Sequence, residues 1–250
     1  MDHSKRILTE IEILSAEGIR DCFEKGVTPD DLHRGRPLFD ELTGGYMRGP
    51  AFKECVKIFA EYGMEFGDDL LLSVLTDDAE LLDRKLSLNS ELAGKKYTID
   101  CAFTPLHEAS LLHICAEFSH AACAEVLIRR GADVNEKAGI DAYGFGGQTP
   151  VFHTVNQHRN ASIETMKLLI RGSADLHITV RGLIWGKGRD WETYIPSVNP
   201  VSYAMMGLLR QFQRTEEDTY ETVRLLMESA YKIDYLPENI PNKYLNKDEL

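Results

Sequence analysis

Residues 129–135 read RRGADVN and follow an apolar run, AACAEVLI, at residues 121–128. A glycine after a helix that ends in two arginines is a typical helix stop, because glycine adopts the left-handed conformation easily and cations stabilise the negative end of the helix dipole. The stretch therefore predicts a helix that ends at Gly131. Residues 110–116 read SLLHICA and predict an earlier helix, and Ser119-His120 predicts the turn between the two.

This predicted helix pair, residues 110–135, resembles the ankyrin repeat. The family pattern begins with Thr-Pro-Leu-His, passes through a Gly-His turn and ends with Gly-Ala-Asp-Val-Asn. Ser110 takes the place of the threonine, His113 that of the histidine, and Ser119-His120 that of the turn. The resemblance implies that His113 hydrogen-bonds backbone groups.

Residues 104–109, TPLHEA, offer a second start for the same pair. The family threonine precedes the glycine by 21 positions, and counting back from Gly131 by that spacing reaches Ser110. A start at Thr104 would require a six-residue insertion. We therefore expect residues 104–109 to connect this pair to the preceding one, with the start at Thr104 as the alternative.

The same pairing of helices is indicated elsewhere in the chain. Thr149-Pro150 begins a second good match, because threonine is a favoured N-cap and proline a favoured first helical residue. Its second helix is predicted at 163–170, but Phe152 replaces the motif histidine and extra residues lie near 158–160. In all, about six pairs, several of them degenerate, are expected near residues 4–30, 36–66, 68–90, 110–135, 149–177 and 199–234.

A single helix pair is too small to bury its own apolar face, so neighbouring pairs must stack. We therefore predict an all-α repeat solenoid that spans residues 1–240 as one domain and ends in a polar tail at residues 241–250. The resemblance implies long loops or β-hairpins between the pairs and a concave side that binds a protein. The predicted function is a non-catalytic protein–protein interaction module.

Two predicted connections, residues 136–148 and 178–198, are long for this family. Long ordered loops tend to be functional, and in solenoids they often lie on the binding face. Both contain aromatic residues or arginine, and Trp, Tyr and Arg dominate interface hot spots. The candidate partner-binding residues are Tyr143, Phe145, Trp185, Arg189, Trp191 and Tyr194. As an alternative, the tryptophans fold back and pack the loops onto the helices.

The chain has 250 residues and a net charge of −12. Residues 1–100 contain 13 Lys or Arg and 21 Asp or Glu, so they alone have a net charge of −8. Such a field repels nucleic acids and anionic membranes and favours a basic protein partner, although acidity also serves solubility.

The sequence has no apolar run of about eighteen residues and no recognisable secretory signal, so we expect a cytoplasmic protein. We also expect a monomer. The five cysteines are then expected to be free thiols. Residues 247–250 read KDEL, a retrieval signal in secretory proteins, which we interpret as a coincidence because no entry signal accompanies it.

No metal or cofactor is expected. Four potential zinc ligands, His113, Cys115, His120 and Cys123, fall within eleven residues, but the repeat frame spreads them over two helices. Other functions remain open: an immunity-type inhibitor that masks a basic toxin, a subunit of a larger assembly, or an enzyme with a small active site on residues 178–198. The candidate catalytic residues for that enzyme are His153, His158, Asp190 and Glu192.

Overall fold

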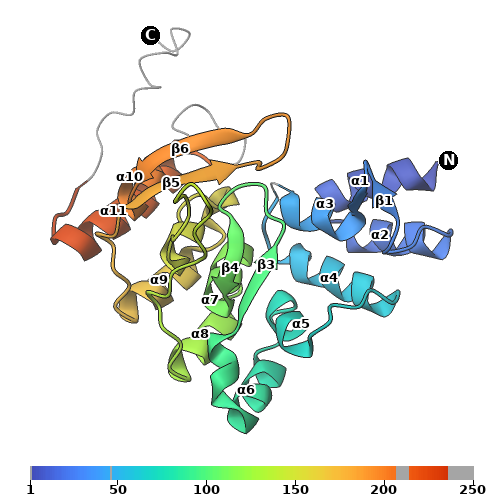
Figure 1. Ribbon diagram of the computed structural model, residues 1–250, viewed down its shortest axis with the longest axis horizontal. Coiled ribbons are helices and arrows are strands. Elements are labelled where there is room, and N and C mark those ends of the chain that lie inside the picture. The colour runs from blue at the N-terminus through green and yellow to red at the C-terminus, as the bar shows by residue number, and fades with distance from the viewer. Residues whose placement is uncertain (1, 46, 207–213, 236–250) are drawn as a thin grey trace, which may run out of the picture.

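The computed structural model describes residues 2–45, 47–206 and 214–235, and the predicted tail at 241–250 lies outside these residues. Short helices follow one another from the N-terminal end at one side of the view to α11 at the other (Figure 1). The α-helices are α1 (His3–Glu12), α2 (Ala16–Glu24), α3 (Leu38–Gly44), α4 (Ala51–Glu61), α5 (Asp69–Leu75), α6 (Ala79–Leu88), α7 (Leu111–Phe118), α8 (Ala121–Arg129), α9 (Ile163–Arg171), α10 (Pro200–Met205) and α11 (Glu216–Tyr231).

The connections contain short strands and 3-10 helices. The strands are β1 (Leu32–His33), β2 (Arg36–Pro37), β3 (Lys96–Ile99), β4 (Leu106–Ser110), β5 (Val180–Trp185) and β6 (Thr193–Val198). The 3-10 helices are η1 (Ser90–Gly94), η2 (Pro150–His153) and η3 (His158–Asn160).

The helices pack against their neighbours in two rows. In one row α1 contacts α3, α5 contacts α7, and α7 contacts η2, which in turn contacts α10. In the other row α2 contacts α4, α6 contacts α8, and α8 contacts α9. Helices from neighbouring pairs therefore cover one another's apolar sides, as expected for units that cannot bury those sides alone.

Helix α7 begins where Ser110 caps it. The Ser110 N–H donates to Nδ1 of His113 over 3.1 Å, and Nε2 of His113 lies 3.0 Å from the carbonyl oxygen of Gln148. Because Nδ1 accepts, Nε2 carries the proton and donates to Gln148. Burial lowers the pKa of His113 to about 3, so the ring is neutral at neutral pH. This histidine therefore ties the start of α7 to the connection that precedes η2.

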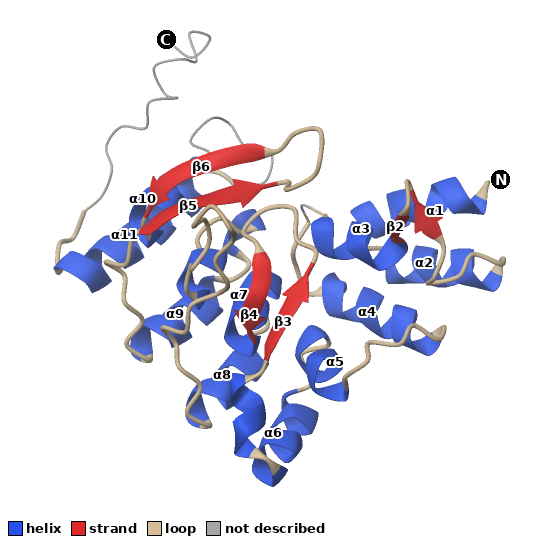
Figure 2. Ribbon diagram, viewed as in Figure 1, coloured by secondary structure: helices blue, strands red, loops and turns tan. Residues whose placement is uncertain are grey.

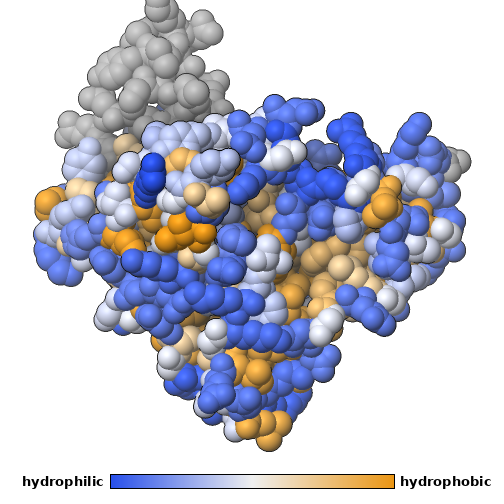
Figure 3. All heavy atoms as spheres, viewed as in Figure 1, coloured by the Kyte–Doolittle hydropathy of each residue, from blue (hydrophilic) through white to orange (hydrophobic). Residues whose placement is uncertain are grey.

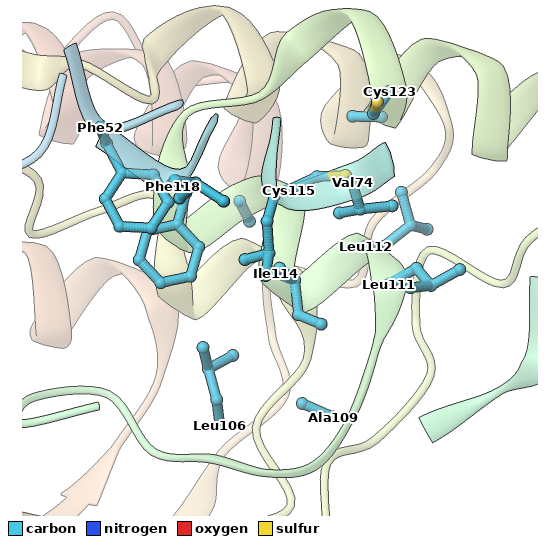
Figure 4. Packing of buried hydrophobic residues seen from close by; sticks show 14 of the residues in the cluster. Phe52, Val74, Leu106, Ala109, Leu111, Leu112, Ile114, Cys115, Phe118 and Cys123 are labelled. Atoms are coloured by element: carbon cyan, nitrogen blue, oxygen red, sulfur yellow. The ribbon is translucent and has the colours of Figure 1, made fainter. Parts of the chain in front are cut away.

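The core is densest around α7, whose eight residues are all buried. Phe118 at its end stacks on Phe52 of α4 with ring centroids 4.2 Å apart, and Figure 4 shows the two rings face to face. Cys115 and Cys123 are also buried here, and the five cysteines are unpaired thiols in the described structure. Among the described residues, no helix combines the length and the apolar character needed to cross a membrane.

The description as all-α does not hold for the connections, which contain the β-hairpins that the resemblance implies. The described residues contain three antiparallel strand pairs, β1 with β2, β3 with β4 and β5 with β6 (Figure 2). Residues 178–198, predicted as a long loop or hairpin, contain β5 and β6, in which Leu183 pairs with Ile195 and Trp185 with Thr193. Their β-branched and aromatic residues favour strands, and the pairing satisfies backbone groups that an open loop would leave to water.

The prediction of a regular first helix after Thr149 is also wrong. Only the 3-10 helices η2 and η3 lie between Thr149 and α9. Arg159 and Asn160 have φ angles of 47° and 52°, which no right-handed helix contains. The segment before them, residues 154–157, reads TVNQ, and threonine, valine and asparagine are weak helix formers.

Candidate protein-binding surface

Three of the six predicted partner-binding residues lie together at the surface. Phe145 packs against Tyr194 with ring centroids 4.8 Å apart, and the ring of Tyr143 lies 6.5 Å from that of Phe145. Tyr143 is 72% exposed and Tyr194 is 50% exposed. The guanidinium of Arg181 lies 5.5 Å from the centre of the Phe145 ring, within cation–π range. We call Tyr143, Phe145, Arg181 and Tyr194 the aromatic surface.

Asp141 orders the backbone beneath this aromatic surface. Its carboxylate accepts hydrogen bonds from the N–H groups of Tyr143 over 2.9 Å and Phe145 over 3.0 Å, and Lys187 lies 3.2 Å from its second oxygen. Burial acts to raise the pKa of Asp141, but these hydrogen bonds outweigh it and hold the pKa below its ordinary value. A backbone hydrogen bond from Gly146 to β5 then joins the loop to the hairpin. Residues from two connections thus form one ordered surface.

Trp185 packs inward. Its indole N–H donates to the hydroxyl of Tyr203 over 2.7 Å, and that hydroxyl also lies 2.8 Å from Oγ1 of Thr104. Tyr203 and Thr104 are both buried. Trp185 therefore fixes the β5–β6 hairpin on α10, which is the arrangement that the alternative interpretation of the tryptophans describes. Contact between Trp185 and a partner stays a prediction.

Trp191 lies near the hairpin turn and is 40% exposed. Its ring stacks on Phe103 with centroids 5.6 Å apart, and the Arg189 guanidinium lies 5.9 Å from its centre. Gly186 permits this position, because its φ is +60° and a Cβ there would lie 2.6 Å from the Trp191 ring. The ring is therefore partly covered within the chain and partly accessible.

Arg189 pairs with a carboxylate that joins three connections. Its Nη2 lies 3.0 Å from Oδ2 of Asp100, and the same oxygen accepts a hydrogen bond from Arg36. Arg36 belongs to β2, Asp100 to the segment between β3 and β4, and Arg189 to the turn between β5 and β6. The hairpin tip is thereby held near the N-terminal helices, and Figure 1 shows β5 and β6 extending toward α3. The sequence carries no signal for these pairs, whose members are 64 and 89 positions apart.

The residues considered for an enzyme site have separate surroundings. His153 is buried, and its Nδ1 lies 2.9 Å from Oε2 of Glu117, whose other oxygen accepts from Nε of Arg48 over 3.1 Å. Glu192 accepts the N–H of Gly188 within the hairpin turn. Within the described parts of the chain, no hydrogen bond or ion pair links any two of the four candidates, His153, His158, Asp190 and Glu192.

Arg48, Glu117 and His153 instead form a buried triad that joins α7 to two other parts of the chain. Burial acts to raise the pKa of Glu117, but His153 and Arg48 outweigh it and lower the pKa, so the carboxylate is ionised. This triad was not predicted from the sequence. Its one signal is a glutamate inside the apolar run ICAEF at residues 114–118, and nothing in the sequence indicates the partners.

A groove of about 350 Å³ lies beside the aromatic surface, and its lining includes Asp100, Cys101, Phe145 and Lys187. Burial raises the pKa of the Cys101 thiol to about 12. The thiol therefore stays protonated at neutral pH and is a poor nucleophile. Among the described residues, no group of three or more His, Cys, Asp or Glu side chains could hold a metal ion.

Residues 103–138 match the sequence model of the ankyrin repeat family. The chain contains an ankyrin repeat. A search of the curated proteins found no matching relative.

The ankyrin match includes both starts considered above, Thr104 and Ser110. In the structure the first helix of the ankyrin repeat, α7, begins after Ser110, while residues 106–110 form β4. The hydrogen bonds of His113 with the Ser110 N–H and with the Gln148 carbonyl oxygen are the backbone contacts that the resemblance implies for the motif histidine. Residues 104–109 therefore lie within the matched stretch but precede its first helix, and residues 106–109 belong to β4.

Proposed function

We propose that the chain is a non-catalytic, protein-binding solenoid in which six stacked helix pairs present the aromatic surface to a protein partner. Ankyrin repeats are in general protein–protein interaction modules, and one lies at residues 103–138. The observation that carries the proposal is the ordered cluster of Tyr143, Phe145 and Tyr194 beside Arg181, in which both tyrosines are exposed. Rigid aromatic side chains give a large contact area at a small cost in conformational entropy.

A basic partner fits the charge of the chain. The net charge is −12, and the face in Figure 3 is mostly hydrophilic, with small hydrophobic patches. An acidic field accelerates association with a basic protein and repels acidic competitors. A basic toxin that the chain masks is one partner of this kind. We also propose a monomer in the cytoplasm, which light scattering and localisation of the tagged protein would test.

The test is affinity capture from an extract of the source organism, with the captured proteins quantified by mass spectrometry. We expect the wild-type chain to retain a partner that the variant Tyr143→Ala/Tyr194→Ala loses. Tyr235→Ala is the matched control, because Tyr235 is 44% exposed but lies outside the aromatic surface. A partner retained equally by all three proteins would overturn the proposed surface.

A further inference from the structure

A cleft of about 520 Å³ lies between the N-terminal helices and the tip of the β5–β6 hairpin. Its apolar lining comes from Leu8, Ile11, Ile13 and Met47. Ile13 is 58% exposed, so this apolar side chain is directly available to a ligand. The cleft is separate from the aromatic surface, because their linings have no residue in common.

Two carboxylates, Glu12 and Glu41, lie in the lining beside these apolar side chains, together with His33, Gly44, Gly45 and Arg189. Within the part of the chain that the structure describes, neither makes an ion pair or a side-chain hydrogen bond. They belong to a region, residues 1–100, with a net charge of −8 from 13 basic and 21 acidic residues. A ligand with cations next to apolar groups would therefore complement the cleft in both charge and polarity.

Arg189 shows how the cleft accommodates a guanidinium. The side chain enters the lining from the hairpin turn and packs over Gly44, where a Cβ would lie 2.7 Å from Nη2 of Arg189. The absence of a side chain at Gly44 lets the flat guanidinium approach the last residue of α3. The same Nη2 pairs with Asp100 at 3.0 Å, so Arg189 leaves the charges of Glu12 and Glu41 unmatched.

We propose that this cleft binds an extended segment of a partner protein in which aliphatic residues alternate with arginine or lysine. The aliphatic side chains pack on Leu8, Ile13 and Met47, and the cations face Glu12 and Glu41. Acidic peptides, nucleic acids and anionic lipids are repelled by the same carboxylates. The inference goes beyond the proposed function, because it assigns a second surface and the chemistry of its ligand.

The probe is a fluorescein-labelled peptide of about six residues in which leucine and arginine alternate, titrated with the full chain and followed by fluorescence anisotropy. We expect saturable binding that the variant Glu12→Gln/Glu41→Gln weakens about tenfold, since two partly exposed charge contacts together give an effect of that order. Ile13→Ser weakens binding as well, because it removes exposed apolar surface. Replacing the arginines of the probe by glutamates abolishes binding.

The matched control is Glu80→Gln/Glu91→Gln, which removes the same net charge at two exposed positions outside the cleft. We expect this control to change the affinity less than twofold and all variants to keep the wild-type circular dichroism spectrum. Equal weakening by both double variants would show unspecific charge attraction and would overturn the inference. No anisotropy change up to about 1 mM of the full chain would overturn it too.

The peptide-binding test of this cleft and the capture test of the aromatic surface can fail independently of each other. Tyr143→Ala/Tyr194→Ala leaves the affinity for the leucine–arginine peptide unchanged, because neither tyrosine lines the cleft. If the peptide fails to bind while that variant still loses its captured partner, the inference falls and the proposed function stands.

Discussion

Two adjacent helix pairs, residues 110–135 and 149–177, differ in how the chain begins each pair and in the contacts that hold that beginning in place. The first pair begins with α7, a regular helix whose eight residues are all buried. The second begins with η2 and η3, which are interrupted by positive φ angles at Arg159 and Asn160. Polar contacts hold the second start in place: the His153–Glu117 pair and hydrogen bonds from Asn160 to Asp218 and Glu221. Both starts bury apolar side chains, and the irregular one also depends on the hydrogen bonds of His153 and Asn160.

The largest effect is expected from the loss of apolar packing in the first pair. Phe118→Ala removes the ring that stacks on Phe52 and leaves a cavity at the centre of the core. We expect a loss of about 4 kcal/mol in the free energy of unfolding, typical for deletion of a buried phenylalanine side chain. Urea denaturation followed by circular dichroism measures it. A loss below about 1 kcal/mol would mean that α7 is not packed as described.

Glu117→Gln tests the link between the two pairs. The amide keeps the shape of the carboxylate but leaves the buried Arg48 without its counter-charge. The expected loss is about 3 kcal/mol in the free energy of unfolding, the order found when one member of a buried ion pair is removed. Glu125→Gln is the control, since Glu125 is exposed on α8 and its replacement should cost less than about 0.5 kcal/mol.

Asn160 tests the hydrogen-bonded start of the second pair. Asn160→Ala is expected to lower the free energy of unfolding by about 2 kcal/mol, because it removes the bonds to Asp218 and Thr222 and strains a residue with positive φ. Asn160→Gly removes the same bonds without the strain, so it should be about 1 kcal/mol less harmful. Equal losses for the two variants would show that backbone strain contributes nothing there.

The last prediction concerns pH and the motif histidine of the first pair. The pKa of His113 falls from 6.5 to about 3 on folding, so below pH 6.5 the unfolded chain binds a proton that the folded chain does not. Stability is then lost as the pH falls from about 6.5 toward 3, by about 1.4 kcal/mol per pH unit from this residue. His113→Asn should reduce the slope by that amount. Denaturation midpoints measured between pH 7 and pH 5 check this, and an unchanged slope would contradict the buried, neutral ring.

The regular pair could be predicted from the sequence because its information is local. The helix stop at Gly131, the cap at Ser110 and the apolar spacing between them all lie within one stretch, and α7 and α8 coincide with the predicted helices. The second helix predicted at 163–170 also coincides with α9, and the pair expected near residues 68–90 consists of α5 and α6. Periodicity identifies such elements because each apolar stripe must face a neighbour.

The irregular start and the surface could not be predicted in the same way. The partners of Glu117 and Asn160 lie 36 to 69 positions away, and no spacing rule connects them. The inward orientation of Trp185 depends on Tyr203, which belongs to another predicted unit. The length and aromatic content of residues 178–198 predicted a binding segment. Which of its aromatic side chains pack inward and which stay exposed depends on tertiary packing, which the sequence does not show.

Carbon chemical shifts measured by nuclear magnetic resonance test the central claim, the stacked helix pair at residues 110–135, most directly. We predict helical Cα shifts for residues 111–118 and 121–129, extended shifts for residues 106–110, and nuclear Overhauser contacts between methyl groups of α5 and α7. Helical shifts that begin at Thr104, or the absence of contacts between α5 and α7, would contradict the account.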